Sequence, residues 1–364
     1  MLGRREFLAA AASLPTTAAI VAKVPSLRAL AAARNIAFGT EVTLAEIAGD
    51  SHYASLVAHE CAIVTPGIEA KWGYIEPADG AFRFGPMDEL ASFARGAGLR
   101  LHMHNLIWAV GLPDWTLRAL QQGRGASIIE RHATIVAGRY KDLTDSWDVV
   151  NEPVDPRWPS DQDGFCMTPW RRALGPQFLP IALSAIHAAA PAARLLINDD
   201  DLEYDAPDRE RKRTTYLRLI EACLKRGAPL HGFGLEAHLK PWLPIADKAY
   251  RRFLHELAGF GLKLYVTELD VCDRTLAADI AVRDGAVADL TRRYLDLVLD
   301  EPAVCTVMIW GLSDRASWML RDPAAYRPDG LTPRPLPYDS HLKAKPMRDA
   351  IAAAFRAARL RPVA

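Results

Sequence analysis

Short apolar runs that favour strands alternate with longer helix-like stretches along nearly all of the chain after residue 35. The eight strand-like runs are Ile36–Gly39, Ala62–Thr65, Arg100–Trp108, Ser146–Asn151, Arg194–Asn198, Gly232–Glu236, Lys263–Glu268 and Thr306–Trp310. The helix-like stretches include Met87–Gly96, Ile128–Tyr140, Phe178–Ala189, Arg209–Arg226, Lys248–Gly259, Val282–Leu299 and Pro346–Arg359. Such alternation indicates an α/β protein with a parallel sheet, and eight repeats favour a single closed (β/α)8 TIM barrel over an open sheet.

Length and charge are consistent with one large domain that acts on a neutral partner. The chain has 364 residues, with 44 basic and 44 acidic side chains. A net charge of zero argues against nucleic acid or an anionic membrane surface as the partner. We therefore expect one barrel domain over residues 32–364, monomeric, with neither a nucleic-acid nor a membrane partner.

The N-terminus has the pattern of an export signal. Arg4 and Arg5 precede an apolar, alanine-rich stretch over residues 8–21, which is too short to span a bilayer. The pattern resembles a twin-arginine signal, and Ala29-Leu30-Ala31 offers a small-residue cleavage site. We expect a signal over residues 1–31 and a periplasmic or secreted protein; a helical or disordered N-terminal extension is the alternative.

The cysteines carry no site signal. Cys61, Cys166, Cys223, Cys272 and Cys305 show no Cys-x-x-Cys spacing, so they predict neither a zinc site nor a disulfide framework. Cys272 and Cys305 would lie at opposite ends of neighbouring strands, too far apart to pair. A disulfide elsewhere stays open, because export leads to an oxidising compartment.

Polar side chains end the strand-like runs, and in a parallel barrel these ends share one rim. They are Glu41, Thr65, Trp108, Asn151-Glu152, Asn198-Asp199, Glu236 with His238, Glu268 with Asp270, and Trp310. Glu152 and Glu268 each follow a run of buried strand formers. Two carboxyl groups that face each other across a cleft can hydrolyse a glycosidic bond, because one protonates the leaving oxygen while the other attacks or activates water.

The motifs around these glutamates resemble those of glycoside hydrolase family 10, the (β/α)8-barrel xylanases, from about residue 36 to the C-terminal helix. The matching motifs are Lys71-Trp72 with Glu76-Pro77 and Gly80-Ala81-Phe82, His104–Trp108 with Leu112–Trp115, Trp147–Glu152, Gly234–Leu239, Val266–Asp270, and Ile309–Asp314 with Ser317-Trp318. The resemblance implies a retaining endo-1,4-β-xylanase that acts on xylan or xylo-oligosaccharides and needs no cofactor or metal.

The resemblance also implies the roles of the catalytic residues. Glu152 would be the general acid/base and Glu268 the nucleophile. His238 and Asp270 would hold Glu268 ionised through a hydrogen-bonded relay. Asn151 would bond the sugar 2-hydroxyl, a contact that strengthens in the transition state.

Substrate contacts follow from the same resemblance. Trp310 and Trp318 would offer flat faces to a sugar ring, while Lys71, His104 and Trp108 would contact the glycone side. Asp199-Asp200-Asp201 is interpreted instead as a solvated loop or a cap for the next helix.

Several positions depart from the family pattern. Gly67-Ile68 stand where a Glu-Asn pair usually grips a sugar one unit from the cleaved bond, so we expect glycone binding to be weaker or differently organised. Ala109 and Gly111 replace His and Gln in the same wall. Asp200 and Asp201 stand where Tyr and Asn are more common.

One departure lies at the centre of the site. Glu236 replaces a glutamine beside the nucleophile. A third carboxylate should raise the proton affinity of one member of the cluster, because like charges repel.

Three alternatives stay open. A family relative with an altered glycone subsite would act on short or decorated oligosaccharides or on another β-glycan. A non-catalytic carbohydrate-binding protein would keep the fold without turnover. A metal-dependent barrel hydrolase could use His102, His104 and His238 with Asp270, although its H-x-H pair lies on the third strand-like run rather than the first.

Overall fold

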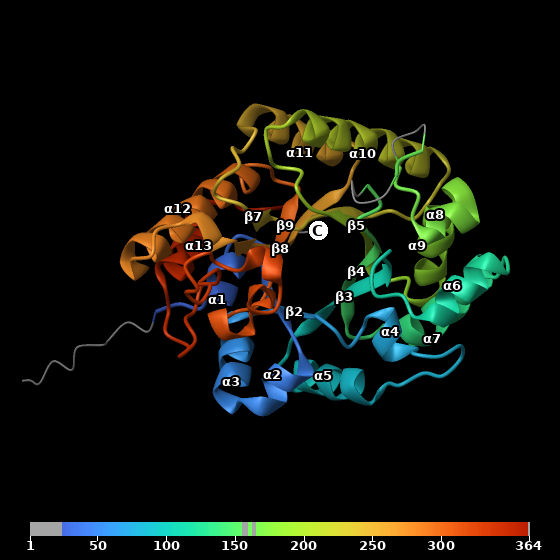
Figure 1. Ribbon diagram of the computed structural model, residues 1–364, viewed down its shortest axis with the longest axis horizontal. Coiled ribbons are helices and arrows are strands. Elements are labelled where there is room, and N and C mark those ends of the chain that lie inside the picture. The colour runs from blue at the N-terminus through green and yellow to red at the C-terminus, as the bar shows by residue number, and fades with distance from the viewer. Residues whose placement is uncertain (1–23, 155–158, 162–164, 363–364) are drawn as a thin grey trace, which may run out of the picture.

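The computed structural model describes residues 24–154, 159–161 and 165–362, and its centre is a ring of parallel strands surrounded by helices (Figure 1). The strands are β1 Ala37–Val42, β2 Ile63–Pro66, β3 Arg100–Ile107, β4 Thr144–Asn151, β5 Arg194–Asp199, β6 Gly232–Leu235, β7 His238–Leu239, β8 Lys263–Val271 and β9 Val304–Ile309.

The sheet closes on itself. Neighbouring strands follow the order β6-β5-β4-β3-β2-β1-β9-β8, and β6 pairs with β8 to complete the ring. All of these pairings are parallel. The predicted (β/α)8 barrel is confirmed, with its eight predicted runs at β1–β6, β8 and β9. The two-residue strand β7 extends the pairing above β6, where His238 lies opposite Asp270 of β8.

Helices follow the strands and cover the outside of the ring (Figure 1). They are α1 Leu27–Ala32, α2 Leu44–Gly49, α3 Ser51–Glu60, α4 Trp72–Ile75, α5 Gly85–Gly96, α6 Asp114–Gln121, α7 Gly125–Tyr140, α8 Pro169–Leu174, α9 Phe178–Ala189, α10 Pro207–Lys225, α11 Asp247–Gly259, α12 Ile280–Val298 and α13 Pro346–Ala357. Short 3-10 turns occur at Gly175–Gln177, Asp273–Thr275, Asp314–Ala316, Trp318–Leu320 and Pro323–Ala325.

The core lies between the strands and the helices. Large side chains such as Trp147, Tyr216, Phe233 and Phe355 are fully buried there. Burial of this apolar surface contributes roughly 25 cal/mol for each Å² removed from water. It makes the rim a rigid platform for the side chains at the strand ends.

The N-terminal boundary bears on the predicted export signal, whose residues 1–23 lie outside the described residues. Leu27 and Ala31 of α1 are buried, and the backbone N–H of Leu27 donates to Glu60 Oε2 at 2.6 Å. Cleavage after Ala31 would therefore remove a helix that packs on the barrel. A signal peptide that is cleaved before Val24 would leave α1 in place.

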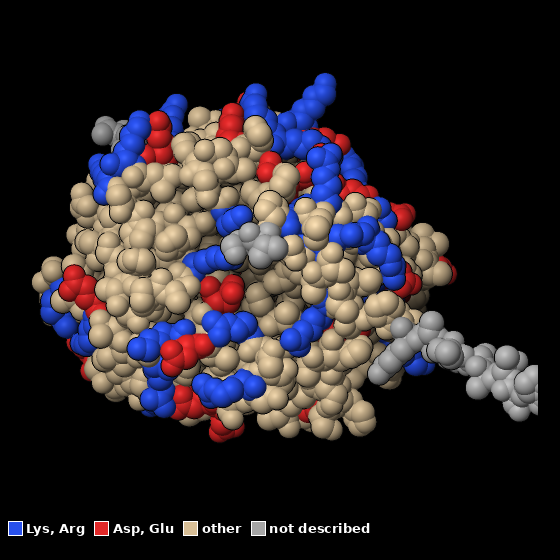
Figure 2. All heavy atoms as spheres, turned by 180° about the vertical axis from the view of Figure 1, so that it is seen from behind, with Lys and Arg blue, Asp and Glu red and all other residues tan. Residues whose placement is uncertain are grey.

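Three predictions concern the molecule as a whole: the state of its cysteines, the distribution of its surface charge and the absence of a membrane-spanning helix. Cys61, Cys223, Cys272 and Cys305 are free thiols. Figure 2 shows basic and acidic side chains interspersed on the face opposite to the view of Figure 1. Within the described residues, no helix combines the length and apolarity needed to cross a bilayer.

Candidate active site

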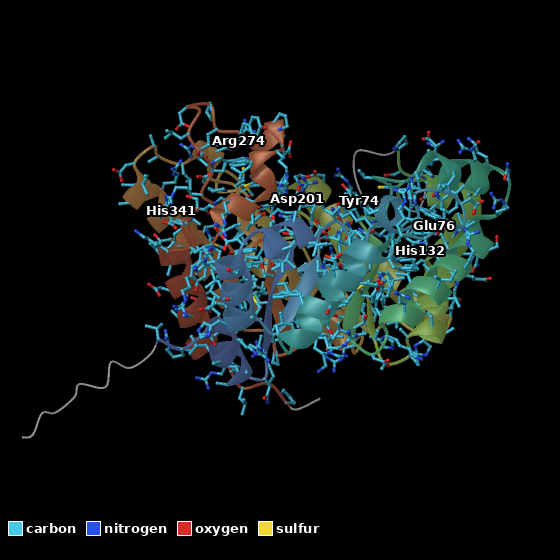
Figure 3. All side chains as sticks on the ribbon, turned by 90° about the horizontal axis from the view of Figure 1, so that it is seen from below. Tyr74, Glu76, His132, Asp201, Arg274 and His341 are labelled. Atoms are coloured by element: carbon cyan, nitrogen blue, oxygen red, sulfur yellow. The ribbon has the colours of Figure 1, made fainter. Side chains whose placement is uncertain are left out.

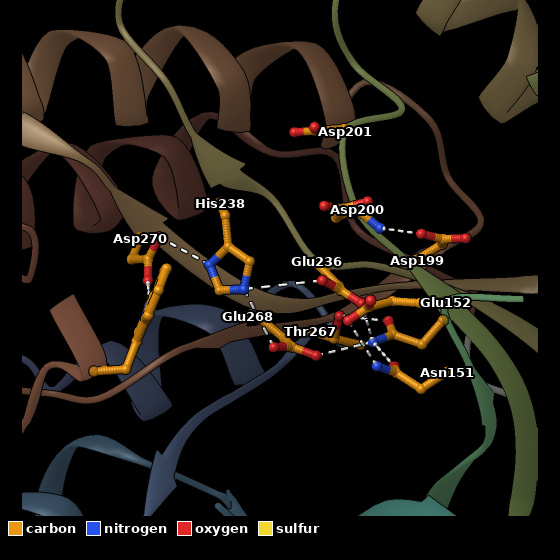
Figure 4. A network of polar contacts seen from close by, with 12 residues as sticks. Asn151, Glu152, Asp199, Asp200, Asp201, Glu236, His238, Thr267, Glu268 and Asp270 are labelled. Atoms are coloured by element: carbon orange, nitrogen blue, oxygen red, sulfur yellow. Dashed lines mark hydrogen bonds and ion pairs between the residues drawn. The ribbon is translucent and has the colours of Figure 1, made fainter. Parts of the chain in front are cut away.

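Glu152 and Glu268 both lie on the rim where the strands end, Glu152 directly after β4 and Glu268 near the end of β8 (Figure 4). The backbone of Glu152 is left-handed, with φ at 48°. A non-glycine residue in this region costs of order 1 kcal/mol, so the surrounding contacts must hold it. Its N–H donates to the carbonyl of Asn198 at 2.9 Å, and its Oε1 accepts from Asn151 Nδ2 at 3.3 Å.

Asn198, the penultimate residue of β5, connects the two glutamates. Its Nδ2 lies 2.8 Å from Asn151 Oδ1, 2.9 Å from Glu268 Oε1 and 3.2 Å from Glu236 Oε1. Its Oδ1 accepts from Thr267 Oγ1 at 2.7 Å. The amide of Asn198 thus fixes the position of Glu268 relative to the strand end that carries Asn151.

Asn198 fits there because Gly234 lies opposite it in the β5–β6 register. A Cβ on Gly234 would come within 2.0 Å of Asn198 Oδ1. Asn198 is predicted from the sequence to lie at a strand end, but no role is predicted for it. The signal that could have revealed it is the glycine two residues before Glu236, which indicates a close approach from the neighbouring strand.

His238 lies between Asp270 and Glu268, as the predicted relay requires. His238 Nε2 lies 3.3 Å from Glu268 Oε2, and its Nδ1 lies 2.9 Å from Asp270 Oδ1. Asp270 Oδ2 also accepts from Trp318 Nε1 at 2.7 Å. Burial opposes a charged imidazole, yet Asp270 and Glu268 outweigh it and hold the pKa of His238 well above its ordinary value.

His104 lies on the other side of Glu268. Its Nδ1 is 3.0 Å from Asp148 Oδ2 and 3.7 Å from Glu268 Oε1. Burial alone would raise the pKa of the Glu268 carboxyl, but His104 and His238 outweigh burial and hold that pKa below its ordinary value. A carboxylate that stays ionised is what a nucleophile needs. The structure thus places His104, predicted as a sugar contact, against the nucleophile candidate.

Asp148 supports His104 from below the rim. Its Oδ2 contacts His102 Nε2 at 2.8 Å as well as His104. Burial would raise the pKa of Asp148, but the two histidines outweigh it and lower that pKa to about 2. His102 is also bonded to Ser146 Oγ at 2.8 Å, so both of its ring nitrogens have partners within the barrel.

Glu236 is the third buried carboxyl group of the network. Burial is the main cause that raises its pKa well above the ordinary value, and the charges of Glu268 and Glu152 add to the effect. The raised proton affinity expected from a third carboxylate therefore falls on Glu236 itself. In its neutral form Glu236 can donate one hydrogen bond, as the amide of a glutamine would.

The residues predicted to contact sugar flank this network. The ammonium of Lys71 lies 4.7 Å from the centroid of the Trp108 ring, as in a cation–π contact. The ring centroids of Trp310 and Trp318 lie 6.4 and 5.4 Å from that of His238. These side chains therefore border the carboxylates on two sides.

The interpretation of Asp199–Asp201 as a solvated loop or a helix cap is wrong. Asp199 and Asp201 are buried, and α10 begins at Pro207 with no side-chain cap at Ala206. The acidic run is ion-paired instead: Asp199 with Lys212, Asp200 with Lys212, and Asp201 with Lys240 and Arg209. The buried carboxylates of Asp199 and Asp201 face cations of neighbouring elements, because burial of an unpaired charge is costly.

Glu76, part of a motif quoted for the family resemblance, is fully buried, and Figure 3 shows it close to His132. Its Oε2 lies 2.8 Å from His132 Nδ1, its other oxygen pairs with Arg131, and its carbonyl accepts from Trp115 Nε1 at 2.9 Å. Glu76 therefore supports the loop that carries Lys71 and does not itself bind substrate.

In the part of the chain that the structure describes, two groups of side chains have donor atoms close enough to hold a cation: His104, Asp148 and Glu268, and Glu236, His238 and Glu268. Neither group combines the histidines of the metal-hydrolase alternative, because His102 binds Asp148 and Ser146. Their donor atoms already contact one another, which fits a hydrogen-bonded network.

Comparison with known proteins identifies the family. The family model for glycosyl hydrolase family 10 matches residues 26–354, nearly all of the described chain. The chain belongs to glycosyl hydrolase family 10. The match starts at residue 26, which agrees with α1 being part of the fold.

Among family 10 relatives, endo-1,4-beta-xylanase C of Phanerodontia chrysosporium is 29% identical over 331 residues, which cover 90% of this chain and 78% of that protein. Endo-1,4-beta-xylanase B of Thermotoga neapolitana is 29% identical over 73% of this chain and 74% of its own length. The crystal structure of native xylanase 10B from Thermotoga maritima superposes with a TM-score of 0.79 at 27% identity, covering 91% of this chain and 98% of that one. Xylanase 10B from Thermotoga petrophila RKU-1, in complex with xylobiose, gives a TM-score of 0.80 at 27% identity, covering 92% and 98%.

The departures from the family 10 pattern can now be placed. Gly111 has φ at 73°, in the region that favours glycine, and both Ala109 and Gly111 lie in the loop after β3. Gly67 follows β2, where a Cβ would come within 1.7 Å of Glu41 Oε1. The space that a side chain at position 67 would take is therefore occupied by the side chain of Glu41 from β1.

Proposed function

We propose that this protein is a retaining endo-1,4-beta-xylanase that cleaves internal bonds of xylan or xylo-oligosaccharides. The observation that carries the proposal is the hydrogen-bonded chain through Asn151 and Asn198 that links Glu152 to Glu268 at the rim of a family 10 barrel. The names of the relatives and the xylobiose complex of one similar structure support the choice of substrate.

The geometry supports a double displacement. The Glu268 carboxylate attacks the anomeric carbon while Glu152 gives its proton to the leaving glycosidic oxygen, so one C–O bond forms as the other breaks. Glu152, now ionised, takes a proton from water, and that water displaces Glu268 from the anomeric carbon. Asn198 and His238 hold Glu268 in place through both steps.

Activity on polymer and on oligomer tests the proposal. Purified protein should release short oligosaccharides from xylan and cut xylohexaose internally. Glu268→Gln and Glu152→Gln should each lower kcat by at least about 1,000-fold, as loss of a nucleophile or its acid partner does. Glu130→Gln, an exposed change on α7, is the matched control and should leave the rate unchanged.

The other results separate the alternatives. Cleavage of oligosaccharides without xylan hydrolysis would favour the relative with an altered glycone subsite, which Gly67 and Ile68 motivate. Sugar binding without any product would favour a non-catalytic binding protein. Failure to bind or cut any xylose-based substrate would contradict the proposal.

We also propose export by the twin-arginine route, on the evidence of Arg4-Arg5 and the apolar stretch that follows. Replacing both arginines by lysine should retain the protein in the cytoplasm on cell fractionation. Unchanged export of that variant would contradict the route.

A further inference from the structure

The buried carboxyl group of Glu41 lacks a hydrogen-bond partner within the described part of the chain. Glu41 lies at the end of β1 opposite Thr65, and 7% of its surface is exposed. Among the described residues, its carboxyl oxygens make no hydrogen bond and no ion pair. The carboxyl oxygens are not fully sealed from solvent, so a ligand at the rim can reach them.

A buried polar group without a hydrogen bond costs about 1–3 kcal/mol, so such a group calls for an explanation. Burial raises the pKa of the Glu41 carboxyl well above its ordinary value, Glu46 adds to this, and Lys71 opposes it. A neutral, protonated carboxyl group can both donate and accept a hydrogen bond. These are the bonds that a neutral ligand rich in hydroxyl groups can satisfy.

The position of Glu41 connects it with the catalytic network. Gly67, whose added Cβ would meet the Glu41 carboxyl group, lies four residues before Lys71 in the segment between β2 and α4. Burial opposes the charged form of Lys71, whereas the charges of Glu268, Glu41, Glu152 and Glu236 favour it. Lys71 in turn lies over Trp108. Glu41 therefore lies on the same side of the rim as the predicted glycone contacts.

Gly67 makes room for this carboxyl group. A Cβ on Gly67 would lie 1.7 Å from Glu41 Oε1 and 2.7 Å from its Cδ. Any side chain at position 67 would displace the carboxyl group of Glu41 from its present place. Glu41 and Gly67 therefore depend on each other. Because position 67 has no side chain, the carboxyl group of Glu41 from β1 can lie there in place of the glutamate that the family pattern carries after β2.

We propose that Glu41 is a substrate-binding residue whose carboxyl group hydrogen-bonds hydroxyl groups of the sugar on the Lys71 side of the cleaved bond. The inference rests on the proposed xylanase function. Of the two expectations for Gly67, weaker or differently organised glycone binding, it favours the second, because the carboxyl group at this place comes from another strand.

Binding to a catalytically silent protein separates this role from the chemistry. In the Glu268→Gln background, isothermal titration with xylotriose should give a measurable Kd. Adding Glu41→Ala should weaken binding about tenfold or more, the effect of losing one or two good hydrogen bonds. Adding Gly67→Ala should weaken it similarly, since the new Cβ displaces the Glu41 carboxyl group without removing it.

The exchange variant Glu41→Ala/Gly67→Glu returns a carboxyl group from β2 and should recover most of the lost affinity. Thermal unfolding of each variant shows that a weak binder is still folded. Binding by the Glu41→Ala and Gly67→Ala variants within twofold of the Glu268→Gln parent would overturn the role of Glu41 alone. Failure of the parent itself to bind xylotriose would overturn both this role and the proposed function.

Discussion

The glutamates of the site have the same side chain in different surroundings. Glu268 is 5% exposed and lies between two imidazoles, which favour its ionised form. Glu236 is equally buried, but carboxylates surround it and favour its neutral form. Glu152 is half-buried and accepts from an amide. Differences of this kind are how one site holds carboxyl groups with separate roles.

The sequence reveals the glutamate at position 236, but it does not predict which carboxyl group of the site keeps the proton. That choice depends on the histidines, which contact Glu268 at 3.3 and 3.7 Å but reach Glu236 only at 3.9 Å. Strand-end positions predict proximity, whereas the contacts of each oxygen depend on side-chain rotamers.

Glu236 predicts a pH-dependent difference in stability. Its folded-state pKa lies above the ordinary 4.5, so the stability that it contributes is present below that pH and is lost as the pH rises through the folded-state pKa. Glu236→Gln removes this titration while keeping a similar shape. The free energy of unfolding of the variant should match the parent near pH 4 and exceed it increasingly at higher pH.

Urea unfolding of both proteins from pH 4 to pH 9 measures this difference. Glu130→Gln serves as the control for removing an exposed glutamate. Parallel stability curves for the parent and Glu236→Gln would show that Glu236 is ionised in the folded protein, against the expectation.

Among the secondary-structure elements, the positions of the strands could be predicted from the sequence. Apolar runs that end in polar residues identified all eight barrel strands, and thereby the rim that carries the site. The register between strands was not predictable, because it depends on long-range pairing, and so the central place of Asn198 was missed. The packing of α1 was missed for a related reason: its alanine-rich sequence is also typical of a signal peptide.

Gly234 offers a test of the β5–β6 register at the site. Gly234→Ala places a Cβ against Asn198 Oδ1 and should push the amide away from Glu268. We expect kcat to fall about 100-fold, the size of effect that a misplacement near 1 Å can have. Asn198→Ala should have a similar effect, and the double variant should lose little more, because both act on one contact.

Gly138→Ala in α7 is the matched control, since a Cβ there meets nothing and alanine favours the helix. Circular dichroism and thermal unfolding establish that the variants fold. Full activity of folded Gly234→Ala would mean that Asn198 does not position Glu268.

At the scale of the whole molecule, the closed barrel brings residues from distant parts of the chain onto one rigid rim. Glu41, Glu152, Glu236 and Glu268 come from four different strand ends, and no local sequence pattern connects them. The balanced charge of the chain is consistent with a neutral glycan, but the identity of the sugar depends on side chains such as Glu41 whose contacts only the fold reveals.

In the proposed mechanism, Glu268 forms a covalent bond to the sugar. Mass spectrometry can detect this bond after reaction with an activated 2-deoxy-2-fluoro-xylobioside, which slows release of a glycosyl intermediate. We expect an added mass of one 2-fluoroxylobiosyl group on the peptide that contains Glu268, absent in Glu268→Gln. Turnover of xylan with an unmodified Glu268 peptide, or with the sugar attached to another residue, would contradict it.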